Sequence, residues 1–219
     1  MIAANIQKIN QEIGKEPRLI AVSKTKPIEA LLEAYQGNQR IFGENKVQEM
    51  LGKYELLPKD IEWHLIGHLQ SNKIKYIAPF VAMIHSVDSF KLLAAIDKEG
   101  AKCQRIIPCL LQVFIATEET KFGLNQSELY EVLDQLKLNP LPHVKICGLM
   151  GMASNTEDPA QIRAEFKSLK VLFTEVKSSY FKAQDSFKEI SMGMSHDYQI
   201  AVEEGATLIR VGSLIFGTR

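Results

Sequence analysis

Lys24 is the residue in this sequence whose position most directly suggests chemistry. It follows the apolar run Leu19-Ile20-Ala21-Val22, which predicts a short buried strand, and Pro27 marks the start of a helix over 28–36. The carboxyl ends of parallel strands form the ligand-binding edge of α/β sheets and barrels. A lysine at this edge could form a Schiff base with a carbonyl compound. Most lysines, however, are solvated surface charges.

Two loops late in the chain are suited to phosphate. Ser191-Met192-Gly193-Met194-Ser195 precedes a predicted helix, whose free amides and dipole favour an anion. Gly212-Ser213 allows close backbone approach and adds a hydroxyl, although glycine turns also have purely steric uses. Lys24 and both loops together would suit a phosphate-bearing aldehyde. Pyridoxal 5′-phosphate (PLP) also needs a ring-nitrogen partner, for which Arg210 is the candidate, unless that arginine only forms an ion pair.

The elements that would position these residues alternate between strand and helix. Strands are predicted at 19–22, 40–45, 62–67, 81–88, 106–115, 144–150, 187–192 and 206–212. Helices are predicted at 2–13, 28–36, 45–54, 71–78, 90–98, 125–138, 162–180 and 197–204. The pattern favours an α/β fold of one domain over residues 1–219, a (β/α)₈ barrel with an extra N-terminal helix, over a doubly wound sheet. Around such a barrel Lys24, Ser191 and Arg210 would be neighbours.

Composition excludes several classes of protein. Lysine plus arginine equals aspartate plus glutamate at 26 each, so no global charge favours nucleic acid. No run of 18 apolar residues exists and the N-terminus lacks a signal-peptide layout, so no membrane association is expected. The five histidines show no metal-ligand spacing. Three widely spaced cysteines predict reduced thiols in a cytoplasmic protein: Cys103, Cys109 and Cys147.

Seven segments together resemble the PLP homeostasis protein family, which is similar in fold to the N-terminal barrel domain of alanine racemase. They cover nearly the whole chain: Ala21-Val22-Ser23-Lys24-Thr25-Lys26-Pro27, Phe42-Gly43-Glu44-Asn45-Lys46-Val47-Gln48-Glu49, Trp63-His64-Leu65-Ile66-Gly67-His68-Leu69-Gln70-Ser71-Asn72-Lys73, Lys121-Phe122-Gly123, Gly148-Leu149-Met150, Ser191-Met192-Gly193-Met194-Ser195 and Arg210-Val211-Gly212-Ser213-Leu214-Ile215-Phe216-Gly217.

This resemblance implies a set of cofactor-binding residues. PLP would form a Schiff base with Lys24, and Arg210 would face its ring nitrogen. The residues implied to hold the phosphate are Ser191, the Gly193-Met194 turn, Gly212 and Ser213. Asn45 and Met150 would line the ring. Ser213 stands where many relatives carry threonine, and its hydroxyl keeps the phosphate contact.

The resemblance also implies a role in intracellular vitamin B6 homeostasis, in which PLP is bound and delivered without significant catalysis. Amino acids and PLP-dependent apo-enzymes are further candidate partners. The chain ends at Arg219, so we expect no second β-rich domain, and none of the six tyrosines marks itself as a base. We therefore assign no catalytic residue and no metal ligand. A PLP-dependent amino-acid racemase or related enzyme is the alternative, and a Schiff-base enzyme acting on a phosphorylated sugar is a third reading.

Overall fold

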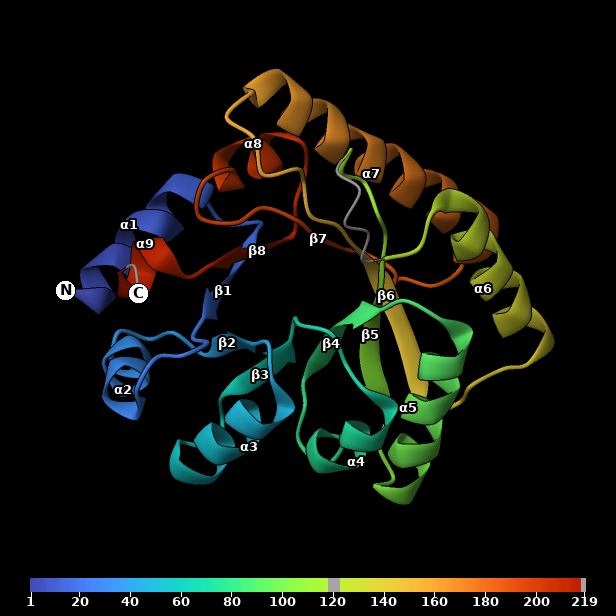
Figure 1. The fold of residues 1–219 in the computed structure, drawn as a ribbon, viewed down its shortest axis with the longest axis horizontal. Coiled ribbons are helices and arrows are strands. Elements are labelled where there is room, and N and C mark those ends of the chain that lie inside the picture. The colour runs from blue at the N-terminus through green and yellow to red at the C-terminus, as the bar shows by residue number, and fades with distance from the viewer. Residues whose placement is uncertain (118–122, 218–219) are drawn as a thin grey trace.

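Eight parallel strands close into a barrel in the computed structural model, which describes residues 1–117 and 123–217 (Figure 1). Each strand pairs with the next, and β1 completes the ring against β8, with Ile20 opposite Arg210. The predicted (β/α)₈ barrel is confirmed. The strands are β1 Arg18–Val22, β2 Ile41–Glu44, β3 Glu62–Leu65, β4 Met83–Val87, β5 Ile107–Gln112, β6 Val144–Met150, β7 Glu189–Ser191 and β8 Leu208–Val211.

Helices surround the barrel and connect its strands (Figure 1). The described helices are α1 Ile2–Ile13, α2 Ile28–Gln36, α3 Val47–Leu56, α4 Ile74–Ile77, α5 Phe90–Lys102, α6 Gln126–Leu138, α7 Pro159–Tyr180, α8 Tyr198–Glu203 and α9 Ser213–Phe216. The helix expected at 71–78 is a 3₁₀ turn, η1 Ser71–Lys73, followed by the single turn α4. The expected N-terminal helix is present as α1, which packs on the side of the barrel against α2, α8 and α9.

One four-residue helix was not expected from the sequence. α9 follows β8 directly and lies between two glycines, too short a segment to show helical periodicity. It packs against α1, where the Asn5 side-chain amide donates to the Ile215 carbonyl at 3.0 Å. The two ends of the described chain therefore meet beside β1 and β8 (Figure 1).

Alternation of side chains along the strands divides the core in two. The larger part lies between strands and helices, with fully buried Trp63, Phe42 and Phe166. A smaller apolar layer fills the barrel interior, formed by Ile20, Met83, Leu110, Cys147, Met150 and Leu208. This packed layer closes the barrel below the carboxyl ends of the strands. Across residues 1–117 and 123–217, no helix combines the length and hydrophobicity needed to cross a bilayer.

The predicted Lys121-Phe122-Gly123 motif falls at the edge of the described residues. Of the predicted Lys121-Phe122-Gly123 motif, Lys121 and Phe122 lie outside the described residues. Gly123 is described and has a φ of +117°, and a β-carbon there would come within 2.9 Å of the Phe114 amide nitrogen. This close approach explains the glycine without a role in binding.

Candidate functional site

A cavity of about 360 Å³ opens above the apolar layer, at the carboxyl ends of the strands. In a (β/α)₈ barrel this end carries the functional site. The volume lies within the range typical of small-molecule sites. Its lining comes from six strand ends and the loops after them: Val22, Lys24, Asn45, Ile66, Met152, Met194, Ser195, His196, Arg210, Gly212 and Ser213.

Lys24 is the available amine of this cavity. Its side chain is exposed and, within the described residues, forms no hydrogen bond or ion pair. Lys26 differs, because its Nζ donates to the carbonyls of Phe216 at 3.3 Å and Gly217 at 2.9 Å. The strand-end position therefore holds a lysine that can turn toward a ligand, whereas the second lysine ties the loop to α9.

The backbone on both sides of Lys24 is fixed although its side chain is not. Thr25 has a φ of +65°, a left-handed conformation that is unusual for a β-branched residue and costs conformational energy. Its amide donates to Oε1 of Glu49 at 2.5 Å. Ser23 is fully buried, and its amide donates to the Gly43 carbonyl of the neighbouring strand at 3.0 Å. The amine is thus presented from a constrained turn.

A buried ion-pair network supports this turn from below. Lys53 Nζ donates to the Ser23 carbonyl and to carboxylate oxygens of Glu44 and Glu49, each at 2.7 Å. Glu44 is fully buried and also accepts from the Ser23 hydroxyl at 2.6 Å. Burial raises the pKa of Glu44, while Lys53 and Ser23 counteract the shift. Two carboxylates and one ammonium therefore leave net negative charge beside the Lys24 turn when both acids are ionised.

Arg210 contributes a buried cation to the same cavity. Its side chain is 4% exposed, and Nη1 donates to the Ser191 hydroxyl at 2.6 Å while Nη2 donates to the Gly151 carbonyl at 3.1 Å. No carboxylate lies within ion-pair distance in the described part of the chain. Burial lowers the pKa of the guanidinium to about 10, partly offset by Asp197, so Arg210 stays charged at neutral pH. Such a group favours an electron-rich ligand.

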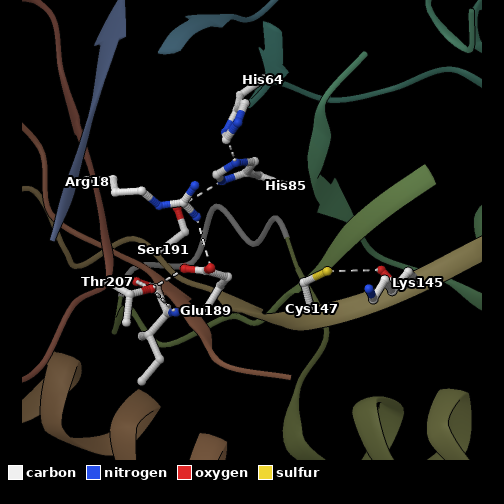
Figure 2. A network of polar contacts seen from close by, with 9 residues as sticks. Arg18, His64, His85, Lys145, Cys147, Glu189, Ser191 and Thr207 are labelled. Carbon is white, nitrogen blue, oxygen red and sulfur yellow. Dashed lines mark hydrogen bonds and ion pairs between the residues drawn. The ribbon is translucent and has the colours of Figure 1, made fainter. Parts of the chain in front are cut away.

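A series of hydrogen bonds continues from Arg210 through Ser191 to two buried histidines, and Figure 2 shows its Ser191–His85–His64 part. Ser191 Oγ lies 2.9 Å from His85 Nδ1, and His85 Nε2 lies 2.9 Å from His64 Nδ1. Burial lowers the pKa of His64 to about 3, with a further contribution from Arg18. Burial also places the pKa of His85 well below its usual value, with smaller effects of His64, Arg210 and Arg18. Both imidazoles are therefore neutral at physiological pH.

Six of the nine residues expected to bind the cofactor line the cavity. Ser191 does not, because it is fully buried beneath Arg210. Met150 belongs to the apolar layer, and Met152 lines the cavity instead. Gly193 packs against α8 at a φ of +91°, where a β-carbon would come within 2.6 Å of the Ala201 β-carbon. The six in the lining are Lys24, Asn45, Met194, Arg210, Gly212 and Ser213.

The loop after β7 differs from the expected helix-terminal anion site. Three residues separate the Met194 position from α8, and the Met194 amide donates to Asp197 Oδ1 at 2.5 Å. That amide is therefore not free for a ligand. Ser195 lines the cavity without having been among the predicted binding residues, although it belongs to the Ser191-Met192-Gly193-Met194-Ser195 loop. Its hydroxyl accepts from the Gly212 amide at 3.3 Å, which joins the two loops expected to hold phosphate.

Five lining residues had no predicted binding role: Val22, Ile66, Met152, Ser195 and His196. Ile66 and Met152 carry no chemical signal. His196 does, since its Nε2 lies 3.2 Å from Oδ2 of the buried Asp197. The sequence signal that could have identified His196 is its position between Ser195 and Asp197 in the loop after β7.

Comparisons with known proteins agree over the full chain. The family model described as alanine racemase, N-terminal domain, matches residues 1–219. A protein of Aquifex aeolicus named pyridoxal phosphate homeostasis protein is 40% identical over 222 residues, which cover 100% of this chain and 95% of that protein. A protein of the same name from Synechocystis is 39% identical over 204 residues, with coverage of 92% and 91%.

Solved structures also match this barrel over nearly its whole length. The structure of PipY from Synechococcus elongatus with PLP bound matches with a TM-score of 0.90 and 38% identity, covering 99% of this chain and 100% of that one. An alanine racemase from Bartonella henselae with covalently bound pyridoxal phosphate matches with a TM-score of 0.72 at 18% identity. That match covers 100% of this chain but 60% of the racemase, and it supports the fold alone.

Proposed function

The chain belongs to the alanine racemase N-terminal domain family, and from that premise we propose that it binds PLP and serves in vitamin B6 homeostasis. In this proposal PLP is held as a Schiff base on Lys24 and is delivered without significant catalysis. Relatives named pyridoxal phosphate homeostasis protein and a PLP-bound structure at 38% identity support the cofactor. One observation of the chain itself carries the proposal: within the described residues, a lysine without a partner and a buried arginine without a carboxylate partner share one cavity.

The residues present fit a phosphorylated pyridine aldehyde. The Lys24 amine can condense with an aldehyde, with loss of one water. Arg210 supplies permanent hydrogen-bond donors on a buried guanidinium, which suit a ring nitrogen acting as acceptor. At Gly212 a β-carbon would come within 3.1 Å of the Val22 carbonyl oxygen, so glycine leaves the backbone close to the cavity. Asn45 and Met194 also line the cavity and would lie beside the bound cofactor.

We assign the phosphate to the loops after β7 and β8. Ser213 offers its hydroxyl and stands at the first position of α9, next to Gly212. Ser195 replaces Ser191 in our assignment, because Ser195 lines the cavity whereas Ser191 is bonded to Arg210 beneath it. Each hydroxyl would donate to a phosphate oxygen, a charge-assisted hydrogen bond stronger than a neutral one.

The surroundings of Arg210 support binding without turnover. When bound, PLP supplies an electron-withdrawing ring that is most effective when its nitrogen is protonated. Arg210 donates and effectively never loses its proton, so it favours an unprotonated nitrogen. In the described chain, none of the tyrosines lines the cavity, which leaves no tyrosine base beside the ligand. These features favour a carrier of PLP over a racemase.

One observation favours the enzymatic alternative enough to be tested. His196 lines the cavity and is paired with Asp197, so it is the side chain there able to move a proton besides Lys24. An amino-acid racemase would need such a second group. Loss of amino-acid stereoinversion in His196→Gln, following measurable activity of the parent protein, would establish the enzyme.

The remaining parts of the proposal concern location and partners. We place the protein in the cytoplasm, because its three cysteines are free thiols, two of them buried. Amino acids are candidate partners because their amines can compete with Lys24 for the aldehyde of PLP. Apo-enzymes that need PLP are candidate recipients. Transfer of PLP from loaded protein to an apo-enzyme, followed by the recovery of its activity, tests that step.

The decisive experiment is a visible spectrum of the protein with PLP, followed by borohydride reduction and peptide mapping. We expect the absorption of bound PLP and a reduced pyridoxyl group on Lys24. A label on Lys26 would overturn the assignment of the residue, and absence of PLP binding would overturn the function. A stereoinversion assay on the same sample separates carrier from racemase.

A further inference from the structure

Ser191, His85 and His64 form a series of hydrogen bonds below Arg210, in a part of the barrel interior where apolar side chains are expected. His64 and His85 are 2% and 0% exposed, and His64 is in register with Met83 of the apolar interior layer. Burying imidazoles costs free energy unless their nitrogens are hydrogen-bonded. Apolar side chains of the same size would fill this space without that cost. Packing alone therefore does not explain why polar side chains occupy this position.

The available hydrogens determine which group donates and which accepts in each hydrogen bond between Arg210, Ser191, His85 and His64. Arg210 can only donate, so Ser191 Oγ accepts from it at 2.6 Å. If His85 Nδ1 also donated to Ser191, the hydroxyl hydrogen would have no acceptor among the described residues. If Ser191 instead donates to His85 Nδ1, the hydroxyl hydrogen of Ser191 and the ring N–H of His85 both have acceptors. His85 then carries its proton on Nε2 and donates it to His64 Nδ1.

This arrangement makes each bond strengthen the next. The positive guanidinium polarises the Ser191 hydroxyl, which becomes a better donor to His85, and His85 in turn becomes a better donor to His64. The chain stabilises the charge of Arg210 without a carboxylate. A carboxylate in place of Ser191 would compete with the ligand for the guanidinium, whereas a neutral hydroxyl leaves the charge of this cavity-lining arginine uncompensated for a ligand.

We propose that His64, His85 and Ser191 are positioning residues for Arg210, with both imidazoles in the Nε2–H form, and that this chain sets how strongly Arg210 holds the ring side of the ligand. The proposal rests on the proposed function for the identity of that ligand, PLP. The tautomers and the contacts within the protein do not depend on it.

The first test uses the ligand-free protein. Long-range ¹H–¹⁵N NMR spectra distinguish the two nitrogens of each histidine. We expect His64 and His85 to carry the proton on Nε2, and we expect Ser191→Ala to shift the Nδ1 resonance of His85. A proton on Nδ1 of His85 in the parent protein would overturn the direction of the chain, whether or not PLP binds.

The second test measures ligand affinity in matched variants. His85→Phe keeps the volume but removes the acceptor for Ser191, and we expect about tenfold weaker binding of both PLP and pyridoxal, the effect of one hydrogen bond. His85→Asn retains an acceptor at the position of Nδ1 and should recover most of the affinity. Leu110→Ala is the control, because it loosens the apolar layer without touching the chain.

The variants separate positioning from simple destabilisation. A structural role alone would lower the melting temperature of His85→Phe and Leu110→Ala alike and leave both affinities near the parent value, which would overturn the proposal. Should His85→Phe not fold, Ser191→Ala takes its place with the same expected loss. If the parent protein binds no PLP, the proposed function is refuted. The NMR test of the histidine tautomers would still decide whether the hydrogen bonds from Ser191 to His64 run in the proposed direction.

Discussion

Acid should destabilise this protein through its buried histidines, and His64 allows the size of the effect to be worked out. Its folded-state pKa of about 3 lies below the usual 6.5 because burial disfavours the charged form. Below pH 6.5 the unfolded chain binds a proton that the folded chain does not. The free energy of unfolding therefore falls with pH by about 1.4 kcal/mol per unit for this residue. Because the unfolded histidine is already half protonated at pH 6.5, the loss between pH 6.5 and 5.0 is about 1.7 kcal/mol.

Urea denaturation of the parent and of His64→Gln at both pH values measures this contribution. The variant removes one titrating group, so its free energy of unfolding should change by about 1.7 kcal/mol less than that of the parent between the two pH values. Comparing variants cancels Glu44, whose raised pKa acts in the opposite direction. His68→Gln is the matched control, because its side chain is 60% exposed and meets solvent in the folded and unfolded chain alike. Equal pH dependence of the parent and His64→Gln would refute the reasoning.

Three further predictions concern the proposed PLP site. Lys24→Ala should abolish the borohydride-trapped label while Lys26→Ala keeps it with weaker binding, as read by mass spectrometry. Ser195→Ala and Ser213→Ala should each cost roughly 1.5–3 kcal/mol of PLP affinity but leave pyridoxal binding unchanged, and equal affinity of the parent for PLP and pyridoxal would contradict a phosphate site. Arg210→Glu should raise the pKa of the ring nitrogen and expose slow exchange of amino-acid α-protons, detectable by NMR in deuterium oxide, with weaker PLP retention; exchange no faster than in the parent would argue against this role of Arg210.

The sequence was sufficient for the barrel and for the two cations of the site. Strand and helix alternate with short connections, and this order leaves few topologies other than a closed parallel barrel. Strand periodicity places Lys24 on the same face as Val22, and both line the cavity. Because β8 pairs with β1 and β7, Arg210 is brought beside Ser191 and the Lys24 turn despite their distance in the chain.

Counting along β6 could not identify the residue that lines the cavity. A register shift interrupts its pairing with β5, and Gly148 adopts a φ of +154° where any β-carbon would collide with the Glu189 carbonyl oxygen. As a result Cys147 and Met150, three residues apart, both face the interior layer. An irregularity of this kind reverses the alternation, and it depends on the neighbouring strand, so the sequence of β6 alone does not reveal it.

The sequence also could not predict how deep Ser191 lies in the barrel. The sequence places it at the end of a strand, but whether that end reaches the cavity depends on how far the strand is staggered relative to its neighbours. Ser191 pairs with Leu208, a member of the apolar layer, and so it lies below Arg210. The chain reaches the cavity only after the left-handed turn at Gly193, which is why Ser195 occupies the place expected for Ser191.

The two cations of the cavity are held in opposite ways, and the difference suits what each would do. Arg210 is fixed at its head group by Ser191 and Gly151, so its charge stays in one place. Lys24 is fixed only through the backbone beside it, where Glu49 holds the Thr25 amide. A group that contacts a ring through permanent donors benefits from rigidity. An amine that must bond to an aldehyde and later release it needs freedom to move. A constrained turn whose lysine side chain contacts no polar partner among residues 1–117 and 123–217 provides that freedom.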